Sequence, residues 1–288
     1  MDRCSFYHTP VGIKRKEINM SETRVMKKYE ELEFRDDFMF GKVMENRELC
    51  REVLECLLQK PVGELQEPQT QREFKFTSDG KPIRIDVYNE DNVGTVYDAE
   101  MQNLNNHSIE WHALPKRSRF YQASIDIDYM NKGNSYDSLP DSNIMFICTF
   151  DPFKKGLCQY TFRERCDEDH NTLLNEGTEK HFYNCCYESE DIPDDLRKLY
   201  EYIRLGRAGN DLTRKIDSAV IEDRRNETWR TQYMKERVII QDAIREEREE
   251  KEKAQKRADE ATKRAEAAEA DNERLRKENE RLRALTTA

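Results

Sequence analysis

The chain has 288 residues, of which 36% are hydrophobic and 38% are charged, and its formal net charge at pH 7 is −10. This charge excludes binding to nucleic acid by overall attraction, so contact with phosphate needs a local basic patch or a bound cation. No run approaches about 18 apolar residues and no basic-then-apolar signal opens the chain, so we expect a cytoplasmic protein without a membrane span.

The first part of the chain is predicted to pass from a flexible arm into helices. Residues 1–28 are mixed in polarity and show no period, so we expect an arm there and an ordered domain from about Tyr29. From Phe38 onward apolar residues recur at helical spacings until Pro61 interrupts them, which predicts one or two helices.

The next part is predicted to form a sheet. Three strand-length runs, REFKFT, IRIDVYN and GTVYDAEMQ, are separated by turn residues, and a turn is expected at Asp79 and Gly80 between the first two. A helix is expected from about Pro115 to Met130. The apolar run NIMFICTF predicts a strand buried on both faces, and LCQYTFRERC and HFYNCCYE predict two more strands. Residues 29–190 are therefore predicted to form an α/β domain with a mixed central sheet flanked by helices.

Residues 191–240 are predicted to form a helical extension. DIPDDLRKLYEYIRLG carries acids in its first turn and Gly206 at its end, as helices prefer. A second helical stretch begins near Asp211 and continues into the tail. Neither stretch carries recognisable chemistry, so we expect the extension to serve packing.

The tail, residues 241–288, is predicted to be a charged coiled coil. It holds 13 Lys and Arg, 14 Asp and Glu and no aromatic residue, so it cannot build a globular core. With Ala254 at heptad position d, small and branched residues fill positions a and d as far as Leu282: Ala258, Ala261, Ala265, Ala268, Asn272, Leu275, Asn279 and Leu282. Asn at a with Leu at d favours a parallel homodimer through residues 254–285. The alternative is a single solvated helix held by ion pairs at four-residue spacing.

The cysteines are more consistent with a reduced compartment than with a disulfide framework. Cys158, Cys166, His170, His181 and Cys185 could be assembled into a zinc set, but none of their gaps is a CxxC. Two of them fall in strand-like runs, where buried thiols are common. A structural zinc site is therefore not expected.

An acidic strand face is the most informative feature of the sequence. In GTVYDAEMQ, Asp98, Glu100 and Gln102 alternate and so share one face of the strand. The preceding strand carries Asp86, and a short connection makes the two strands antiparallel neighbours, so that Asp86 can lie across from Glu100.

Two carboxylates this close repel each other unless a cation lies between them. The pair therefore predicts an Mg²⁺ site, with Mn²⁺ as an alternative, in which Gln102 would point at the attacking water. Asp98 is assigned no role. The competing interpretation is that all these acids are solvated on the open face of a hairpin.

The order and spacing of several short motifs resemble a known family. Asp86 is followed after thirteen residues by Glu100-x-Gln102, and RDDFMFGKVM, IRIDVY, YDAEMQ, RSRFYQASID and NETWRTQYM surround this pattern. Together they resemble the recombination-promoting nuclease and putative transposase group of the PD-(D/E)XK superfamily, from about Leu32 to Met234.

The resemblance implies a restriction-endonuclease-like core and a magnesium-dependent DNA endonuclease, with Asp86 and Glu100 as metal ligands and catalytic residues together with Gln102. The main departure is Gln102, which stands where the superfamily name has lysine and brings no positive charge. Asp37, in the first helix, is a candidate accessory acid, although a helix-start residue is the simpler interpretation.

Two further positions are candidates for binding DNA. Arg117 and Tyr121, four residues apart on the helix after the site, could face the phosphate backbone. A core position is the simpler interpretation of Tyr121.

Three functions compete at this point. The first is a DNA endonuclease tied to recombination or mobile elements and dimerised by its tail. The second is a catalytically weakened protein of the same fold that binds DNA or another protein and is assembled through its coiled coil. The third is a purely structural coiled-coil protein with a globular head, which would leave the pairing of Asp86 and Glu100 as coincidence.

Overall fold

The computed structural model describes residues 27–74, 83–103, 113–131, 133 and 135–286. The predicted arm, except for its last two residues, lies outside the described residues, as does the turn expected at Asp79 and Gly80.

The described residues contain a six-stranded mixed sheet with the order β1-β2-β3-β4-β6-β5. β3 pairs in parallel with β4, and β4 with β6, whereas the other three pairings are antiparallel. All seven residues of β4 are buried, as the apolar run predicted, because helices cover both faces of this parallel centre. The strands are β1 (Gln69–Phe74), β2 (Ile83–Glu90), β3 (Val96–Gln102), β4 (Ser142–Cys148), β5 (Gln159–Phe162) and β6 (Thr178–Asn184).

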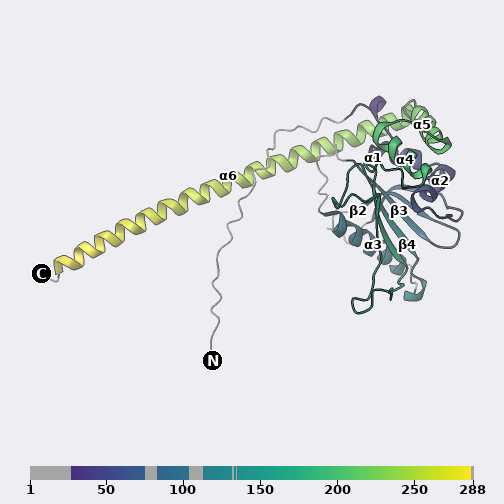
Figure 1. Cartoon of the computed structure of the whole chain (residues 1–288). Helices are drawn as coiled ribbons and strands as arrows, with labels where there is room; N and C mark the ends of the chain where they lie inside the picture. Colours follow the sequence, from purple (N-terminus) through teal and green to yellow (C-terminus); the bar gives the residue numbers. More distant parts are fainter. Residues whose placement is uncertain (1–26, 75–82, 104–112, 132, 134, 287–288) are drawn as a thin grey trace.

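Helices cover the sheet unequally (Figure 1). One hydrophobic cluster joins one face of the sheet to α1 (Asp37–Met44), α2 (Arg47–Leu58), α4 (Asp194–Leu205) and α5 (Asp211–Asp223). A second cluster joins the other face to α3 (Leu114–Asn131). These layers confirm the predicted mixed sheet flanked by helices.

The alternation of β3 follows these two layers. Tyr97, Ala99 and Met101 belong to the first cluster and Val96 to the second. The even-numbered acids of β3 therefore face α3, in agreement with the predicted period of two. They do not face open solvent, because α3 lies over them.

Single residues mark where the C-terminal helices end or begin. α4 ends where Gly206 adopts a left-handed φ of 69°, as the sequence suggested. The helical stretch expected from Asp211 into the tail is divided into α5 and a separate helix, α6 (Glu227–Thr286). Asn226 separates them, because its side chain accepts hydrogen bonds from the backbone N–H groups of Thr228 and Trp229.

The start of α6 is fastened to the body, and the rest projects away from it as a single rod (Figure 1). Tyr233 packs its ring against those of Tyr29 and Phe38 and donates a hydrogen bond to the carbonyl of Lys27 at 2.8 Å. The long tail helix is thus confirmed, whereas its pairing with a second copy stays a prediction. None of the described helices combines the length and apolarity that crossing a membrane requires.

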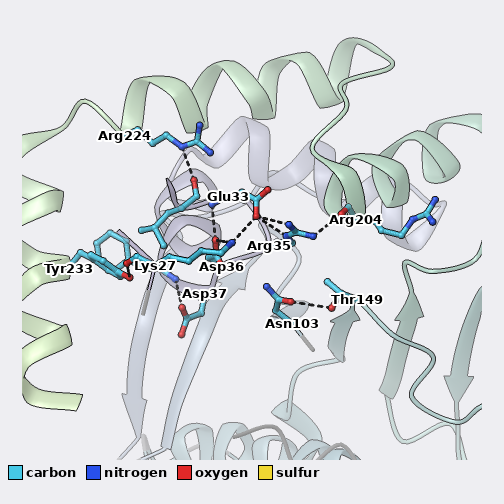
Figure 2. Close-up of polar contacts among 12 residues, drawn as sticks. Lys27, Glu33, Arg35, Asp36, Asp37, Asn103, Thr149, Arg204, Arg224 and Tyr233 are labelled. Atoms are coloured by element: carbon cyan, nitrogen blue, oxygen red, sulfur yellow. Dashed lines mark hydrogen bonds and ion pairs between the residues drawn. The ribbon is translucent and has the colours of Figure 1, made fainter. Parts of the chain in front are cut away.

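A polar network ties the segment before α1 to the C-terminal helices (Figure 2). Lys27 pairs with Glu33 and Asp36, at 2.7 and 2.8 Å. Arg35 donates to the carbonyl of Arg204 at the end of α4, and Arg224 donates to the carbonyl of Leu32. These contacts hold the start of α1 at a defined place beside the sheet.

Candidate active site

The strands β2 and β3 separate where the two predicted metal ligands lie. Their ladder runs from Glu90 opposite Val96 to Val87 opposite Ala99, and the next step of this register places Asp86 opposite Glu100. At this step, hydrogen bonds between backbone N–H groups and side-chain carboxylates replace the backbone–backbone pairing.

Each carboxylate accepts a hydrogen bond from the other strand. The N–H of Asp86 donates to Oε1 of Glu100 at 2.8 Å, and the N–H of Met101 donates to Oδ2 of Asp86 at 3.2 Å. These bonds hold the two carboxylates against each other and fix their orientation.

Burial makes this acid pair reluctant to ionise. Asp86 is 9% exposed and Glu100 is 1% exposed. Burial and then the charge of Asp98 raise the pKa of Glu100 to about 8, against the opposing effect of Arg117. Burial, followed by the charges of Glu100 and Asp37, raises the pKa of Asp86 well above its usual range. A cation placed here would relieve both the burial and the repulsion.

Asp37 is the first residue of α1 and contributes to the site by charge. Its carboxylate accepts a hydrogen bond from the N–H of the next residue, Phe38, at 2.9 Å, while Asp36 takes the N-cap position. Among the contacts drawn in Figure 2 it stands outside the network of Lys27, Glu33 and Asp36. Because its charge raises the pKa of Asp86, it lies near enough to add to the negative potential of the pair.

Arg117 and Tyr121 of α3 contact the acidic face of β3 directly. Arg117 donates from Nη1 to Oε1 of Gln102 at 3.0 Å and from Nη2 to Oε2 of Glu100 at 3.2 Å. The hydroxyl of Tyr121 accepts from Arg117 at 2.7 Å and donates to Oε2 of Glu100 at 3.3 Å. Tyr121 is 6% exposed and belongs to the second core cluster, so it serves both the core and the site.

Asp98, to which the sequence assigns no role, lies on the same buried face of β3 as Glu100. It is 0% exposed, and within the described part of the chain neither of its carboxylate oxygens has a hydrogen-bond partner. Burial and the charge of Asp86 raise the pKa of Asp98 well above its usual range. The interpretation of these acids as solvated is therefore wrong, because α3 covers this face.

The donor set suits a hard divalent ion. Asp86 and Glu100 offer carboxylate oxygens, which Mg²⁺ and Mn²⁺ prefer, and one oxygen of Asp86 has no hydrogen bond to any described residue. Within the described ranges no group of three or more His, Cys, Asp or Glu side chains is placed to hold a metal ion. An ion held by the pair would therefore complete its shell with water and phosphate oxygens, as Mg²⁺ commonly does.

A mixed sheet flanked by helices, with two carboxylates facing each other where adjacent strands separate, places the molecule in the class of PD-(D/E)XK nuclease folds. Residues 32–184, more than half of the chain, match the model of the PD-(D/E)XK nuclease family transposases, and the chain belongs to this family. The match includes all six strands and ends at Asn184, so the helical extension and the tail lie beyond it. No curated protein and no solved structure matches the chain.

Proposed function

We propose that this protein is a divalent-metal-dependent DNA endonuclease associated with recombination or mobile elements. The observation that carries the proposal is the facing pair of buried carboxylates, Asp86 and Glu100, at the separation of β2 and β3. Membership of a nuclease and transposase family supports phosphodiester hydrolysis as the reaction and DNA as the substrate.

In this proposal Asp86 and Glu100 hold the metal ion and Asp37 adds negative potential. A bound Mg²⁺ ion would stabilise charge on the scissile phosphate and lower the pKa of a water molecule. The chain itself fixes where this happens, because each ligand is anchored to the backbone of the opposite strand. Such anchoring keeps the ligands in place before substrate arrives.

Gln102 orients the reacting groups by hydrogen bonding. The side-chain oxygen of Gln102 accepts a hydrogen bond from Arg117. The amide nitrogen of Gln102 is therefore the group left to donate a hydrogen bond to a water or phosphate oxygen. An amide nitrogen donates and cannot take up a proton, so Gln102 holds its partner in place without acting as a base.

DNA would approach along α3. The body before residue 241 carries 36 basic and 45 acidic residues, 36 − 45 = −9, so contact with phosphate requires a local patch. The first turns of α3 offer one, since Lys116 and Arg119 are exposed and Arg117 lies beside the acid pair.

The tail would assemble two copies. α6 is exposed along its heptad stripe, and Leu275 and Leu282 are 54% and 57% exposed in the single chain. Two parallel helices would cover these leucines and pair Asn272 and Asn279 with their counterparts. A dimer would bring two sites to one duplex.

The deciding experiment is plasmid cleavage. Supercoiled plasmid is incubated with Mg²⁺ and the wild type, Asp86→Asn, Glu100→Gln or the control Glu90→Gln, which makes the same change as Glu100→Gln at the last residue of β2. We expect the wild type and the control to nick the plasmid and the two site variants to lose at least about 100-fold in rate.

The competing candidate is a protein of the same fold that binds DNA without cutting it. The neutral Gln102 favours this alternative, because it leaves β3 without a cation. Retained binding to a labelled duplex with no cleavage in Mg²⁺ or Mn²⁺ would establish the alternative and refute the endonuclease.

A further inference from the structure

We propose that Arg117 supplies from α3 the positive charge that β3 lacks at Gln102, so that the two side chains together do the work of the motif lysine. This inference rests on the proposed function. The family description places a lysine two residues after the acid, and this chain has Glu100-x-Gln102 there. Phosphodiester cleavage builds negative charge in the transition state, which a neutral amide by itself cannot offset.

Arg117 makes the contacts that we expect of a cation that replaces the motif lysine from another element. Its guanidinium donates to both Glu100 and Gln102, the acid and the x+2 residue of the motif. A simple ion pair would need only the contact with Glu100. The bond to the oxygen of Gln102 polarises that amide, so positive charge is passed toward the amide nitrogen.

The guanidinium is also held in place from behind. Its carbon lies 5.4 Å from the ring centre of Tyr121 and 5.6 Å from that of Phe146, and these two rings stack at 6.0 Å. The Tyr121 hydroxyl accepts a further hydrogen bond from it at 2.7 Å. An arginine clamped between rings and acceptors is preorganised, which is what electrostatic catalysis requires.

The same guanidinium is still open to a substrate. The side chain of Arg117 is 36% exposed, whereas Glu100 and Gln102 beneath it are almost completely buried. Its charge therefore lies between the acid pair and the outside of the molecule. Lys116 and Arg119 on the same helix are exposed and are not among the residues that contact Glu100 or Gln102.

Moving the charge back to β3 tests the inference. Plasmid cleavage, with DNA binding measured in Ca²⁺, is compared for the wild type, Arg117→Gln, and Arg117→Gln combined with Gln102→Lys. We expect Arg117→Gln to lose about 100-fold or more in cleavage rate with DNA affinity changed less than about threefold, and the added lysine to restore most of the rate. Thermal melting verifies that each variant is folded.

Arg119→Gln is the control, because we expect Arg119 to bind DNA phosphate without taking part in cleavage. It should weaken DNA binding in a salt-dependent way, and Gln102→Lys should not rescue it. If Arg117→Gln behaves in this way instead, or if the double variant is folded but no more active than Arg117→Gln, the inference is overturned.

Binding of Mn²⁺ without DNA provides a readout independent of cleavage. Removing a cation beside Glu100 should tighten Mn²⁺ binding by about three- to tenfold, and the lysine at position 102 should reverse the gain. Unchanged Mn²⁺ affinity in Arg117→Gln would overturn the inference even if the wild type cleaves. A wild type that does not cleave refutes the proposed function and, with it, the catalytic part of the inference. A wild type that cleaves, with Arg117→Gln cleaving equally fast, overturns the inference alone.

Discussion

Glu100 couples metal binding to proton release. Its pKa of about 8 means that the metal-free protein holds this carboxyl mostly protonated at pH 7, and a metal ion must displace the proton. The ionised fraction rises about tenfold for each pH unit below 8.

We therefore expect the affinity for Mn²⁺ to increase steeply from pH 6 to pH 8 and level off above that. Calorimetry in two buffers of different ionisation enthalpy would count the protons released. Glu100→Gln should bind weakly at every pH, and a wild-type affinity that does not change over this range would contradict the assignment of Glu100.

Asp98 is predicted to cost stability. A buried carboxyl that has no hydrogen-bond partner among the described residues is unfavourable. The raised pKa of Asp98 means that the folded chain keeps a proton that the unfolded chain loses as the pH rises above about 4. Stability contributed by the protonated form is thus lost toward high pH. Asp98→Val should stabilise the metal-free protein by about 1–3 kcal/mol at pH 8 and by less at pH 5, as measured by urea unfolding.

The outcome also decides whether Asp98 takes part in the chemistry. If Asp98 contributes only its charge, the Asp98→Val variant should retain a cleavage rate within about tenfold of the wild type. Asp98→Asn, which keeps a polar group in the same place, should stabilise the protein less. Complete loss of cleavage in a folded Asp98→Val variant would make Asp98 a functional acid.

Among the elements, α6 depends on its first turns for its attachment to the body. Tyr233 is 7% exposed, and both its ring and its hydroxyl have partners. Tyr233→Phe removes one hydrogen bond and should cost about 1 kcal/mol, whereas Tyr233→Ala also leaves a cavity and should cost about 3 kcal/mol. Urea unfolding of both variants checks the order, and equal effects would show that the ring does not anchor the helix.

At the scale of the whole molecule, the tail is predicted to control assembly. Deleting residues 254–288 should convert a dimer to a monomer in sedimentation, because the heptad stripe is removed while the body is left intact. Ala268→Lys, at a d position, should weaken the dimer, whereas Ala270→Lys, at an outward f position, should not. A tail-deleted protein that still sediments as a dimer would disprove the role of the coiled coil.

Local patterns in the sequence predicted the strands, the long tail helix and the pairing of Asp86 with Glu100. The period of two in GTVYDAEMQ and the short connection from IRIDVYN were enough to place Asp86 across from Glu100, because strand alternation and hairpin pairing are properties of neighbouring sequence. The heptads of the tail likewise predicted its long helix.

Other features depended on contacts between distant segments. The sequence did not show that Arg117 would bind Gln102, because α3 and β3 meet only when the helix packs across the sheet. Nor did it show that Asp98 would be buried, because alternation separates two faces without revealing that α3 covers one of them. The sequence by itself determined which acids share a face; the tertiary structure decided that this face is closed and that its positive charge comes from a helix, because burial and charge pairing arise from packing.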